Sequence, residues 1–252
     1  MSTELFSLSG RTALVTGART GIGRAVALGL SEAGADLILL GHNDDLEEVA
    51  GQARDRGSAV RQVVADLTDP QHARELLEPV VAEHEIDVLV NNAGTIHREP
   101  ATEVDMADWR RVLDINTDSV FALSQLVGRG MVERGHGRVI NIASLLSFQG
   151  GKGVPAYAAS KHAVAGLTKA LANEWGPHGV RVNAIAPGYI ATNNTAALRA
   201  DPAREPEIRG RIPAGRWGTP DDLTGAAVFL ASDAANYVNG HVLAVDGGWM
   251  SR

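Results

Sequence analysis

Seven short runs rich in apolar and β-branched residues recur along the chain, and longer segments with helix-like spacing of apolar residues separate them. The runs occupy residues 11–16, 36–40, 59–65, 87–92, 138–144, 181–187 and 241–248. Strands that alternate with helices form a parallel sheet covered on both faces. Because no linker or repeat interrupts the alternation, the sequence predicts one α/β domain, residues 1–252, around a doubly wound parallel sheet of about seven strands.

Composition narrows the classes of protein that remain. Apolar residues make up 44% of the 252 residues, enough for a large core, and the lack of cysteine excludes disulfides and thiolate chemistry. The net charge of −7 without a basic run argues against nucleic acid, and no apolar stretch approaches the ~20 residues of a membrane helix. Since the first residues lack a secretory signal pattern, we expect a cytoplasmic protein without a membrane or nucleic-acid partner.

One interval breaks the alternation of strands and helices. Residues 188–219 are polar, contain prolines and show no clear strand pattern. A segment of this length inside a compact domain is more often a functional lid than a plain connection. We therefore expect a substrate lid at 188–219, with a solvated surface excursion as the alternative.

The first predicted strand leads into TGARTGIG, residues 16–23, and then into a segment with helical spacing. Glycines at a strand-to-helix turn let the backbone approach a pyrophosphate, and the helix N-terminus adds free N–H groups and the positive end of a dipole. The spacing Gly-x3-Gly-x-Gly differs from the Gly-x-Gly-x2-Gly of the dinucleotide fingerprint. The segment predicts a nucleotide site, and a tight turn that needs three glycines is the alternative.

The identity of the nucleotide depends on the end of the second strand. Dinucleotide-binding folds often place an acid there, on the ribose 2′-hydroxyl, or a basic residue that meets a 2′-phosphate. This chain has Gly41, His42 and Asn43 at that point, while Arg19 of the glycine loop can either meet a 2′-phosphate or point into solvent. The sequence favours NAD and leaves NADP open.

Two further polar segments follow predicted strands. Asp66 comes after the third strand, and NNAG, residues 91–94, comes after the fourth. The carboxyl ends of parallel strands lie at one edge of the sheet, where open α/β sheets bind ligands. Although Asp, Asn and Gly are also ordinary turn residues, their shared position favours a role in binding.

Tyr157 and Lys161 stand four residues apart in YAASK, within a helical pattern over residues 155–176. This spacing places both side chains on one helix face. A phenol with a pKa near ~10 is a poor base at neutral pH, and a nearby ammonium lowers that pKa. An ordinary surface pair has the same spacing, so the pair predicts an acid/base site only together with other motifs.

Six motifs in order resemble those of the short-chain dehydrogenase/reductase family: TGARTGIG, NNAG, Asn116 in LDINT, Ser144, YAASK and APGYIAT. The resemblance covers nearly the whole chain. It implies a Rossmann-type subunit, a nicotinamide cofactor, hydride transfer at a hydroxyl or ketone, and commonly a homotetramer. It assigns catalysis to Asn116, Ser144, Tyr157 and Lys161. It assigns cofactor binding to Gly17, Arg19, Thr20, Gly21, Ile22, Gly23, His42, Asp66, Leu67, Asn92, Ala93, Gly94, Tyr157, Lys161, Pro187, Gly188, Ile190 and Thr192.

The resemblance also implies a role for each catalytic residue. Tyr157 is the acid/base, and Lys161 lowers its pKa and holds the nicotinamide ribose. Ser144 hydrogen-bonds the substrate oxygen as its charge changes. Asn116 lies in a helix that the family kinks around a water, and it relays protons to solvent.

Other segments resemble family members that act on sugar acids: NNAGTIHRE, NIASLLSFQGG, LANEW, NAIAPGYIATNNT, RIPAGRWG and VDGGW. The implied substrates are 2-dehydro-3-deoxy-D-gluconate and 2-deoxy-D-gluconate. A guanidinium suits a carboxylate, so Arg98 is the expected anchor, with a salt bridge at the surface or a subunit interface as its alternative role. The candidate substrate contacts are Arg98, Ser144, Ser147, Gln149, Tyr157, Asn193 and Asn194.

Alternative functions remain open at this point. A gluconate 5-dehydrogenase or another carbonyl reductase, such as one for 3-oxoacyl thioesters, would share the same motifs. A nucleotide-sensing binding protein on a former dehydrogenase fold would be expected to lose Tyr157 or Lys161, and both are present. The eight histidines show no ligand spacing, so no metal is predicted.

Overall fold

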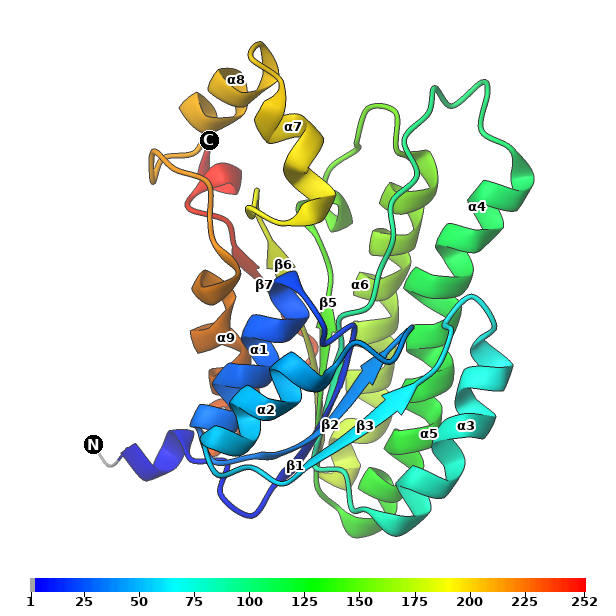
Figure 1. Ribbon diagram of the computed structural model, residues 1–252, viewed down its shortest axis with the longest axis vertical. Helices are drawn as coiled ribbons and strands as arrows, with labels where there is room; N and C mark the ends of the chain where they lie inside the picture. The colour runs from blue at the N-terminus through cyan, green and yellow to red at the C-terminus, as the bar shows by residue number, and fades with distance from the viewer. Residues whose placement is uncertain (1–2) are drawn as a thin grey trace.

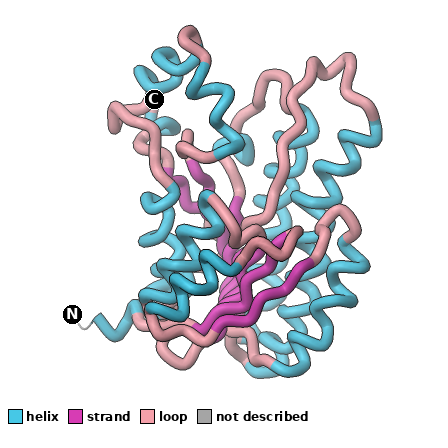
Figure 2. The backbone as a smooth tube through the Cα atoms, viewed as in Figure 1, coloured by secondary structure: helices cyan, strands magenta, loops and turns pink. Residues whose placement is uncertain are grey.

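The computed structural model describes residues 3–252. Seven strands form one parallel sheet in the order β3-β2-β1-β4-β5-β6-β7 (Figure 1, Figure 2). Their bounds are β1 Thr12–Thr16, β2 Asp36–Gly41, β3 Val60–Val64, β4 Val88–Asn91, β5 Gly137–Ile142, β6 Val180–Pro187 and β7 Val242–Val245. Each strand overlaps one of the seven predicted runs, so the predicted fold class is confirmed.

Helices cover both faces of this sheet (Figure 1). One face packs against α1 (Gly21–Glu32), α2 (Glu47–Asp55) and α9 (Thr224–Ala231). The other face packs against α3 (Pro70–Glu83), α5 (Ser119–Arg134) and α6 (Pro155–Trp175), and α4 (Met106–Leu113) leads into α5. The predicted helix over 155–176 is therefore present as α6. Among the described residues, no helix is long and apolar enough to cross a membrane.

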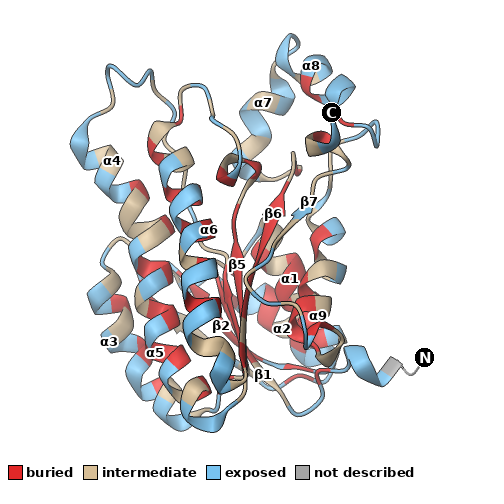
Figure 3. Cartoon of the chain, turned by 180° about the vertical axis from the view of Figure 1, so that it is seen from behind, coloured by how far each residue is buried: buried red, intermediate tan, exposed pale blue. Residues whose placement is uncertain are grey.

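The central strands are mostly apolar, as expected for a sheet that is covered on both faces. Leu14 packs in the cluster with α3 and α5, whereas the next residue, Val15, packs in the cluster with α1, α2 and α9. Both side chains are fully buried. Figure 3 shows the buried strands between exposed outer helix faces. Burying a side chain of this kind contributes about 1.5–3 kcal/mol, so the sheet is a rigid platform for whatever its edge holds.

The order of the strands reverses at β1. The chain runs outward from β1 to β2 and β3, and then returns to place β4 on the other side of β1. The loops that leave the carboxyl ends of β1 and β4 therefore diverge. A crevice forms at such a reversal point, which is where open α/β sheets bind their ligands.

Residues 188–219 lie beyond the carboxyl ends of the strands and hold two short helices, α7 (Ala196–Ala200) and α8 (Arg204–Arg211) (Figure 1). The absence of a strand from this segment, expected from the sequence, is seen apart from a single β-bridge between Ile190 and Gly218 at its base.

Both ends of this segment contact the C-terminal residues. The Tyr189 ring lies 4.6 Å from that of Trp249, and the Arg211 guanidinium stacks 4.1 Å from the Trp249 ring. Leu145, Ile208 and Ile212 are buried in the same cluster, which we call the aromatic anchor, and Leu198 of α7 packs against it. Aromatic and cation–π contacts of this kind add about 0.5–1.5 kcal/mol each, so the anchor holds the start and the α8 part of the segment together.

Candidate active site

A cavity of about 610 Å³ opens at the crevice between the strand ends. It is lined by every residue that the sequence proposed for cofactor binding, from the glycine loop to Thr192. Of the residues proposed for catalysis or substrate contact, the cavity is also lined by Ser144, Tyr157, Lys161, Asn193 and Asn194. The glycine loop, NNAG, Ser144, the Tyr157 and Lys161 pair and the start of the 188–219 segment therefore share one cavity.

The glycine loop is shaped to let a ligand approach its backbone. Gly17 and Gly21 have φ angles of 64° and 57°, which favour glycine. A Cβ on Gly23 would overlap Asn92 Nδ2 and the Gly17 carbonyl oxygen. At the N-terminus of α1, the Thr20 side chain makes no capping hydrogen bond, so the first N–H groups stay available to a ligand. A close backbone cradle with free donors suits the pyrophosphate of a dinucleotide.

The NNAG segment is tied to the glycine loop by its own side chain. Asn92 Nδ2 donates to the carbonyl oxygens of Thr16 and Gly17 at 2.9 and 3.2 Å. Thr16 Oγ1 in turn accepts hydrogen bonds from the backbone N–H groups of Asn92 and Ala93. The ends of β1 and β4 are thus held together at the floor of the cavity, a contact that the sequence could not specify.

Tyr157 and Lys161 lie on one face of α6, as the four-residue spacing predicted. Lys161 Nζ lies 5.6 Å from the centre of the Tyr157 ring and donates to the Ile142 carbonyl oxygen at 2.7 Å. Lys161 is 4% exposed, while Tyr157 keeps partial exposure through the cavity. Lys161 is therefore buried and Tyr157 opens only into the cavity, so the two residues do not form an ordinary surface pair.

Burial perturbs both groups. It raises the pKa of the Tyr157 phenol, and a hydrogen bond with Ser144 and the positive charge of Arg98 act in the opposite direction. Burial lowers the pKa of Lys161 to about 8. Both shifts have desolvation as their main cause, because each charged form loses water in this position. A strongly perturbed pair that faces a cavity is typical of a catalytic site.

Asn116 lies behind this pair and not on the cavity wall. It sits in a π-helical turn, Asp114–Asp118, that interrupts the path from α4 to α5. Its Nδ2 donates to the Thr95 carbonyl oxygen and to Ser160 Oγ, and Ser160 Oγ donates to the Tyr157 carbonyl oxygen. The irregular helix that the family resemblance implied is present, and Asn116 connects to the backbone of Tyr157 through one hydroxyl.

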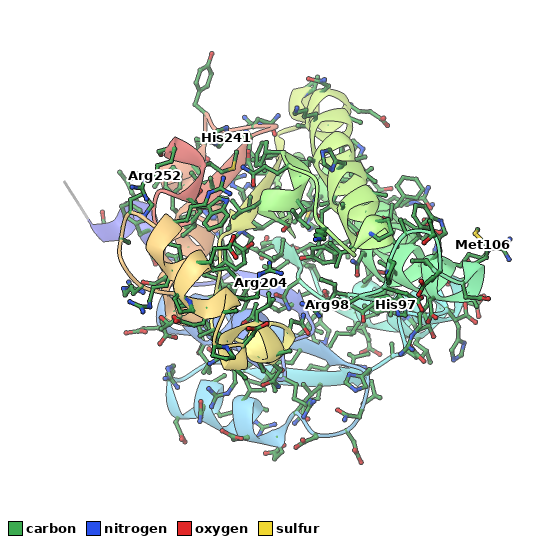
Figure 4. The ribbon with its side chains drawn as sticks, turned by 90° about the horizontal axis from the view of Figure 1, so that it is seen from above. His97, Arg98, Met106, Arg204, His241 and Arg252 are labelled. Atoms are coloured by element: carbon green, nitrogen blue, oxygen red, sulfur yellow. The ribbon has the colours of Figure 1, made fainter. Side chains whose placement is uncertain are left out.

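Arg98 bridges the loop after β4 and the start of the 188–219 segment. Its Nη2 donates to the Asn194 carbonyl oxygen at 2.8 Å, and its charge acts on Tyr157. Figure 4 shows Arg98 beside this segment on the loop that also holds His97. The guanidinium therefore lies near enough for its charge to act on the phenol, although Arg98 is not among the described residues that line the cavity.

Two expected substrate contacts lie elsewhere. Ser147 is 7% exposed and its hydroxyl donates to the Lys161 carbonyl oxygen at 2.6 Å. The Gln149 side-chain oxygen accepts a hydrogen bond from Trp249 Nε1. Neither residue is among the described residues that line the cavity. Both side chains hold neighbouring segments in place, so the structure does not support their assignment to the substrate.

Several lining residues were not anticipated from the sequence. Arg111 and Ile115 enter the cavity wall from α4 and the π-helical turn, and Thr95 follows NNAG directly. The pKa of Asp66 is lowered mainly by a hydrogen bond from the Thr68 backbone N–H, and the charge of Arg111 acts weakly in the same direction. Arg111 and Ile115 could have been inferred from the position of Asn116, because a helix that brings Asn116 near the site also brings the residues just before it.

The fold and this cavity define a dinucleotide-binding oxidoreductase with a tyrosine–lysine pair. The family model described as "Enoyl-(Acyl carrier protein) reductase" matches residues 17–250. The chain belongs to the short-chain dehydrogenase/reductase family, whose members use NAD or NADP, and its fold is of the Rossmann type.

Known proteins cover the whole length of the chain. The 2-dehydro-3-deoxy-D-gluconate 5-dehydrogenase of Bacillus subtilis (strain 168) is 55% identical over 99% of this chain and 98% of its own. A Beutenbergia cavernae structure, provisionally described as an NAD(P)-dependent gluconate 5-dehydrogenase with NADP at low occupancy, has a TM-score of 0.97 and 58% identity over 98% and 100% of the two chains. A gluconate 5-dehydrogenase from Burkholderia cenocepacia J2315 with NADP and tartrate has a TM-score of 0.92 and 42% identity over 99% and 98%.

Proposed function

We propose that this chain is a dehydrogenase that transfers hydride between a nicotinamide cofactor and a hydroxyl or ketone of a sugar acid. The proposed substrate is 2-dehydro-3-deoxy-D-gluconate or 2-deoxy-D-gluconate. The observation that carries the proposal is the position of Arg98 near the Tyr157 and Lys161 pair. Its guanidinium is a suitable partner for the carboxylate of a sugar acid. The likeness to the Bacillus subtilis enzyme over the full length supports the choice of substrate class.

In the proposed reaction, the nicotinamide ring of the cofactor would accept or donate the hydride. Tyr157 takes the proton from the substrate hydroxyl, and the Lys161 ammonium favours the phenolate form. Ser144 donates a hydrogen bond to the substrate oxygen. Asn116, through Ser160, holds the Tyr157 backbone and lies on the proposed route by which the proton reaches solvent.

The cofactor-holding residues form three groups around the cavity. The glycine loop and the N-terminus of α1 would hold the pyrophosphate, His42 and Asp66 would bind the adenosine, and the backbone from Pro187 to Thr192 would bind the nicotinamide; all of these residues line the cavity. We propose NAD as the preferred cofactor and NADP as the second. The preference is supported by the neutralisation of Arg19, which forms an ion pair with Asp45.

The proposed assembly is a homotetramer, and its proposed contact is the outer face of α6. Ala159, Ala163, Gly166 and Ala170 are exposed along that face. Small residues at this spacing allow a second helix to approach closely. Residence in the cytoplasm and closure of 188–219 over the substrate belong to the same proposal.

A substrate panel tests the proposed function. We expect NADH formation from 2-deoxy-D-gluconate to be about tenfold faster than from D-gluconate. The same advantage is expected for NADH oxidation by the ketoacid partner of 2-dehydro-3-deoxy-D-gluconate. The reason is that D-gluconate has an extra hydroxyl, which must find a hydrogen-bond partner in a site fitted to the deoxy sugar acid. The panel includes 5-keto-D-gluconate and a 3-oxoacyl thioester, each with NAD and NADP. Absence of turnover with every sugar acid would refute the substrate class.

Replacing Arg98 by alanine tests the carboxylate anchor. We expect KM for the sugar acid to rise about ten- to hundredfold with kcat less affected, because a hydrogen bond to a charged group contributes about 1.5–3 kcal/mol. Arg110→Ala, on an exposed position of α4, is the control.

An uncharged methyl ester of the same substrate separates the two possible roles of Arg98. If Arg98 binds the carboxylate, its loss raises KM for the acid and not for the ester. If Arg98 only holds the Asn194 carbonyl, KM rises equally for both, and the carboxylate assignment is wrong.

A further inference from the structure

An ion pair stands at the rim of the cavity where the glycine loop meets the turn after β2. Arg19 Nη1 lies 3.2 Å from Asp45 Oδ2. Arg19 lines the cavity, whereas Asp45 stands just behind it, in the turn between β2 and α2. The side chain of Arg19 is 36% exposed and that of Asp45 is 70% exposed. Both side chains are therefore partly or largely in contact with solvent.

The pair lies where a dinucleotide presents its adenosine ribose. In folds of this kind, the carboxyl end of the second strand meets the ribose 2′ position, through an acid for a hydroxyl or a basic residue for a phosphate. Here β2 ends at Gly41 and the cavity wall continues with His42, neither of which is an acid. Two acids follow in the next turn, Asp44 and Asp45, and Asp45 forms the ion pair with Arg19.

The two cofactors differ at that point in charge. NAD presents a neutral 2′-hydroxyl, and NADP presents a phosphate with about −2 charge, by analogy with other phosphomonoesters. Arg19 is the cation of the glycine loop that can meet the phosphate, but Asp45 already neutralises it. A 2′-phosphate has to displace the Asp45 carboxylate from Arg19 and then remain beside that negative charge. A 2′-hydroxyl meets neither obstacle.

We propose that Asp45 is a specificity-determining residue that weakens NADP binding by holding Arg19 in an ion pair, and leaves NAD binding unchanged. The inference rests on the proposed function, because it requires a nicotinamide dinucleotide in this cavity. Asp45 acts through Arg19 and makes no contact with the cofactor. The ratio of the affinities for NADP and NAD is then set by the exposed carboxylate of Asp45, which lies outside the cavity wall.

Many exposed ion pairs have little effect, so the test isolates the coupling between the two residues. Dissociation constants for NAD, NADP, 5′-AMP and 2′,5′-ADP are measured by calorimetry at one fixed ionic strength, without substrate. The proteins are the parent, Asp45→Asn, Arg19→Gln and the double variant. Asp44→Asn is the matched control, because it removes the same charge from the same turn, and the structure records no ion pair between Asp44 and Arg19 in residues 3–252.

We expect Asp45→Asn to tighten NADP and 2′,5′-ADP about two- to fivefold, the range expected for a partly exposed ion pair. The affinities for NAD and 5′-AMP should stay within about 1.5-fold of those of the parent. Arg19→Gln should weaken the two 2′-phosphate ligands. In that background, Asp45→Asn should change nothing beyond the effect of the Asp44→Asn control.

Three results would overturn the inference. An unchanged ratio of NADP to NAD affinity in Asp45→Asn would show that Asp45 does not discriminate between the two cofactors. An equal gain in the Arg19→Gln background would show that it does not act through Arg19. Weaker NAD binding in Asp45→Asn would make Asp45 a direct ligand of the ribose. Failure of the parent to bind NAD or 5′-AMP would instead refute the proposed cofactor site itself, and the inference with it.

Discussion

Replacement of Tyr157 by phenylalanine is expected to lower kcat by about 10³-fold or more and to leave the dissociation constant of the cofactor within about twofold. The phenol is the proposed acid/base, and a positioned proton-transfer group contributes about 10²–10⁴-fold to a rate. The ring itself stays in place because phenylalanine has the same shape. Single-turnover kinetics and calorimetric cofactor binding measure the two quantities separately.

Tyr237→Phe is the control for this experiment, since Tyr237 is fully exposed and far from the cavity wall. The pH profile adds a second criterion. Burial raises the pKa of Tyr157, so the rate of alcohol oxidation should climb with pH through the range in which the phenol loses its proton. Retention of turnover in the phenylalanine variant would assign the proton transfer to another group.

Replacement of Lys161 by methionine is expected to lower kcat about 10²-fold or more and yet to stabilise the cofactor-free protein at neutral pH. The ammonium is buried, with a pKa of about 8 in the fold against 10.5 for an unperturbed lysine. Holding that charge without water costs about 3 kcal/mol at pH 7. After about 1 kcal/mol is subtracted for the lost hydrogen bond to Ile142, we expect a net gain of about 2 kcal/mol.

The pH dependence of this gain has a definite sign. Because the pKa of Lys161 is lower in the fold than in the unfolded chain, the unfolded chain binds more protons between about pH 8 and 10.5. The cost is complete below pH 8 and disappears as the pH rises toward 10.5. The stability difference between the variant and the parent should therefore shrink by about 2 kcal/mol from pH 7 to pH 10.

Urea unfolding of the cofactor-free proteins at several pH values measures this difference. Lys169→Met is the control, because Lys169 is an exposed lysine of the same helix. A difference between Lys161→Met and the parent that stays constant with pH would mean that the ammonium is not desolvated in the fold. A loss of stability at pH 7 would mean that its hydrogen bond outweighs its burial.

The fold was predictable from the sequence because strand and helix patterns are local. Buried strands such as β4, with the sequence VLVN and all four residues buried, appear as short runs dominated by apolar residues. The face shared by Tyr157 and Lys161 was predictable for the same reason, since helix geometry alone places residues four apart together. The strand order, however, depends on contacts between segments that no local pattern records.

The direction of a polar side chain was the least predictable feature. Ser147 follows Ser144 by three residues and has the same chemistry, yet its hydroxyl meets the Lys161 carbonyl of a helix that starts several residues later. Gln149 meets Trp249, which is 100 residues away in the chain. Arg19 and Asp45 are likewise joined by tertiary structure alone. Such pairings are decided by packing, so residue type and spacing could not identify them.

The aromatic anchor has a consequence for how this scaffold can change its substrate. It joins Tyr189 at the start of residues 188–219 and Arg211 near their end to Trp249, while Asn193 and Asn194 between these points line the cavity. Leu198 and Asp201 have structural roles, because Leu198 packs against the anchor and Asp201 accepts backbone hydrogen bonds at the start of α8, whereas Asn193 and Asn194 are not among the described residues of the anchor cluster. Diversification within a family, and redesign in the laboratory, can therefore change these two side chains while the anchor keeps both ends of the segment in place.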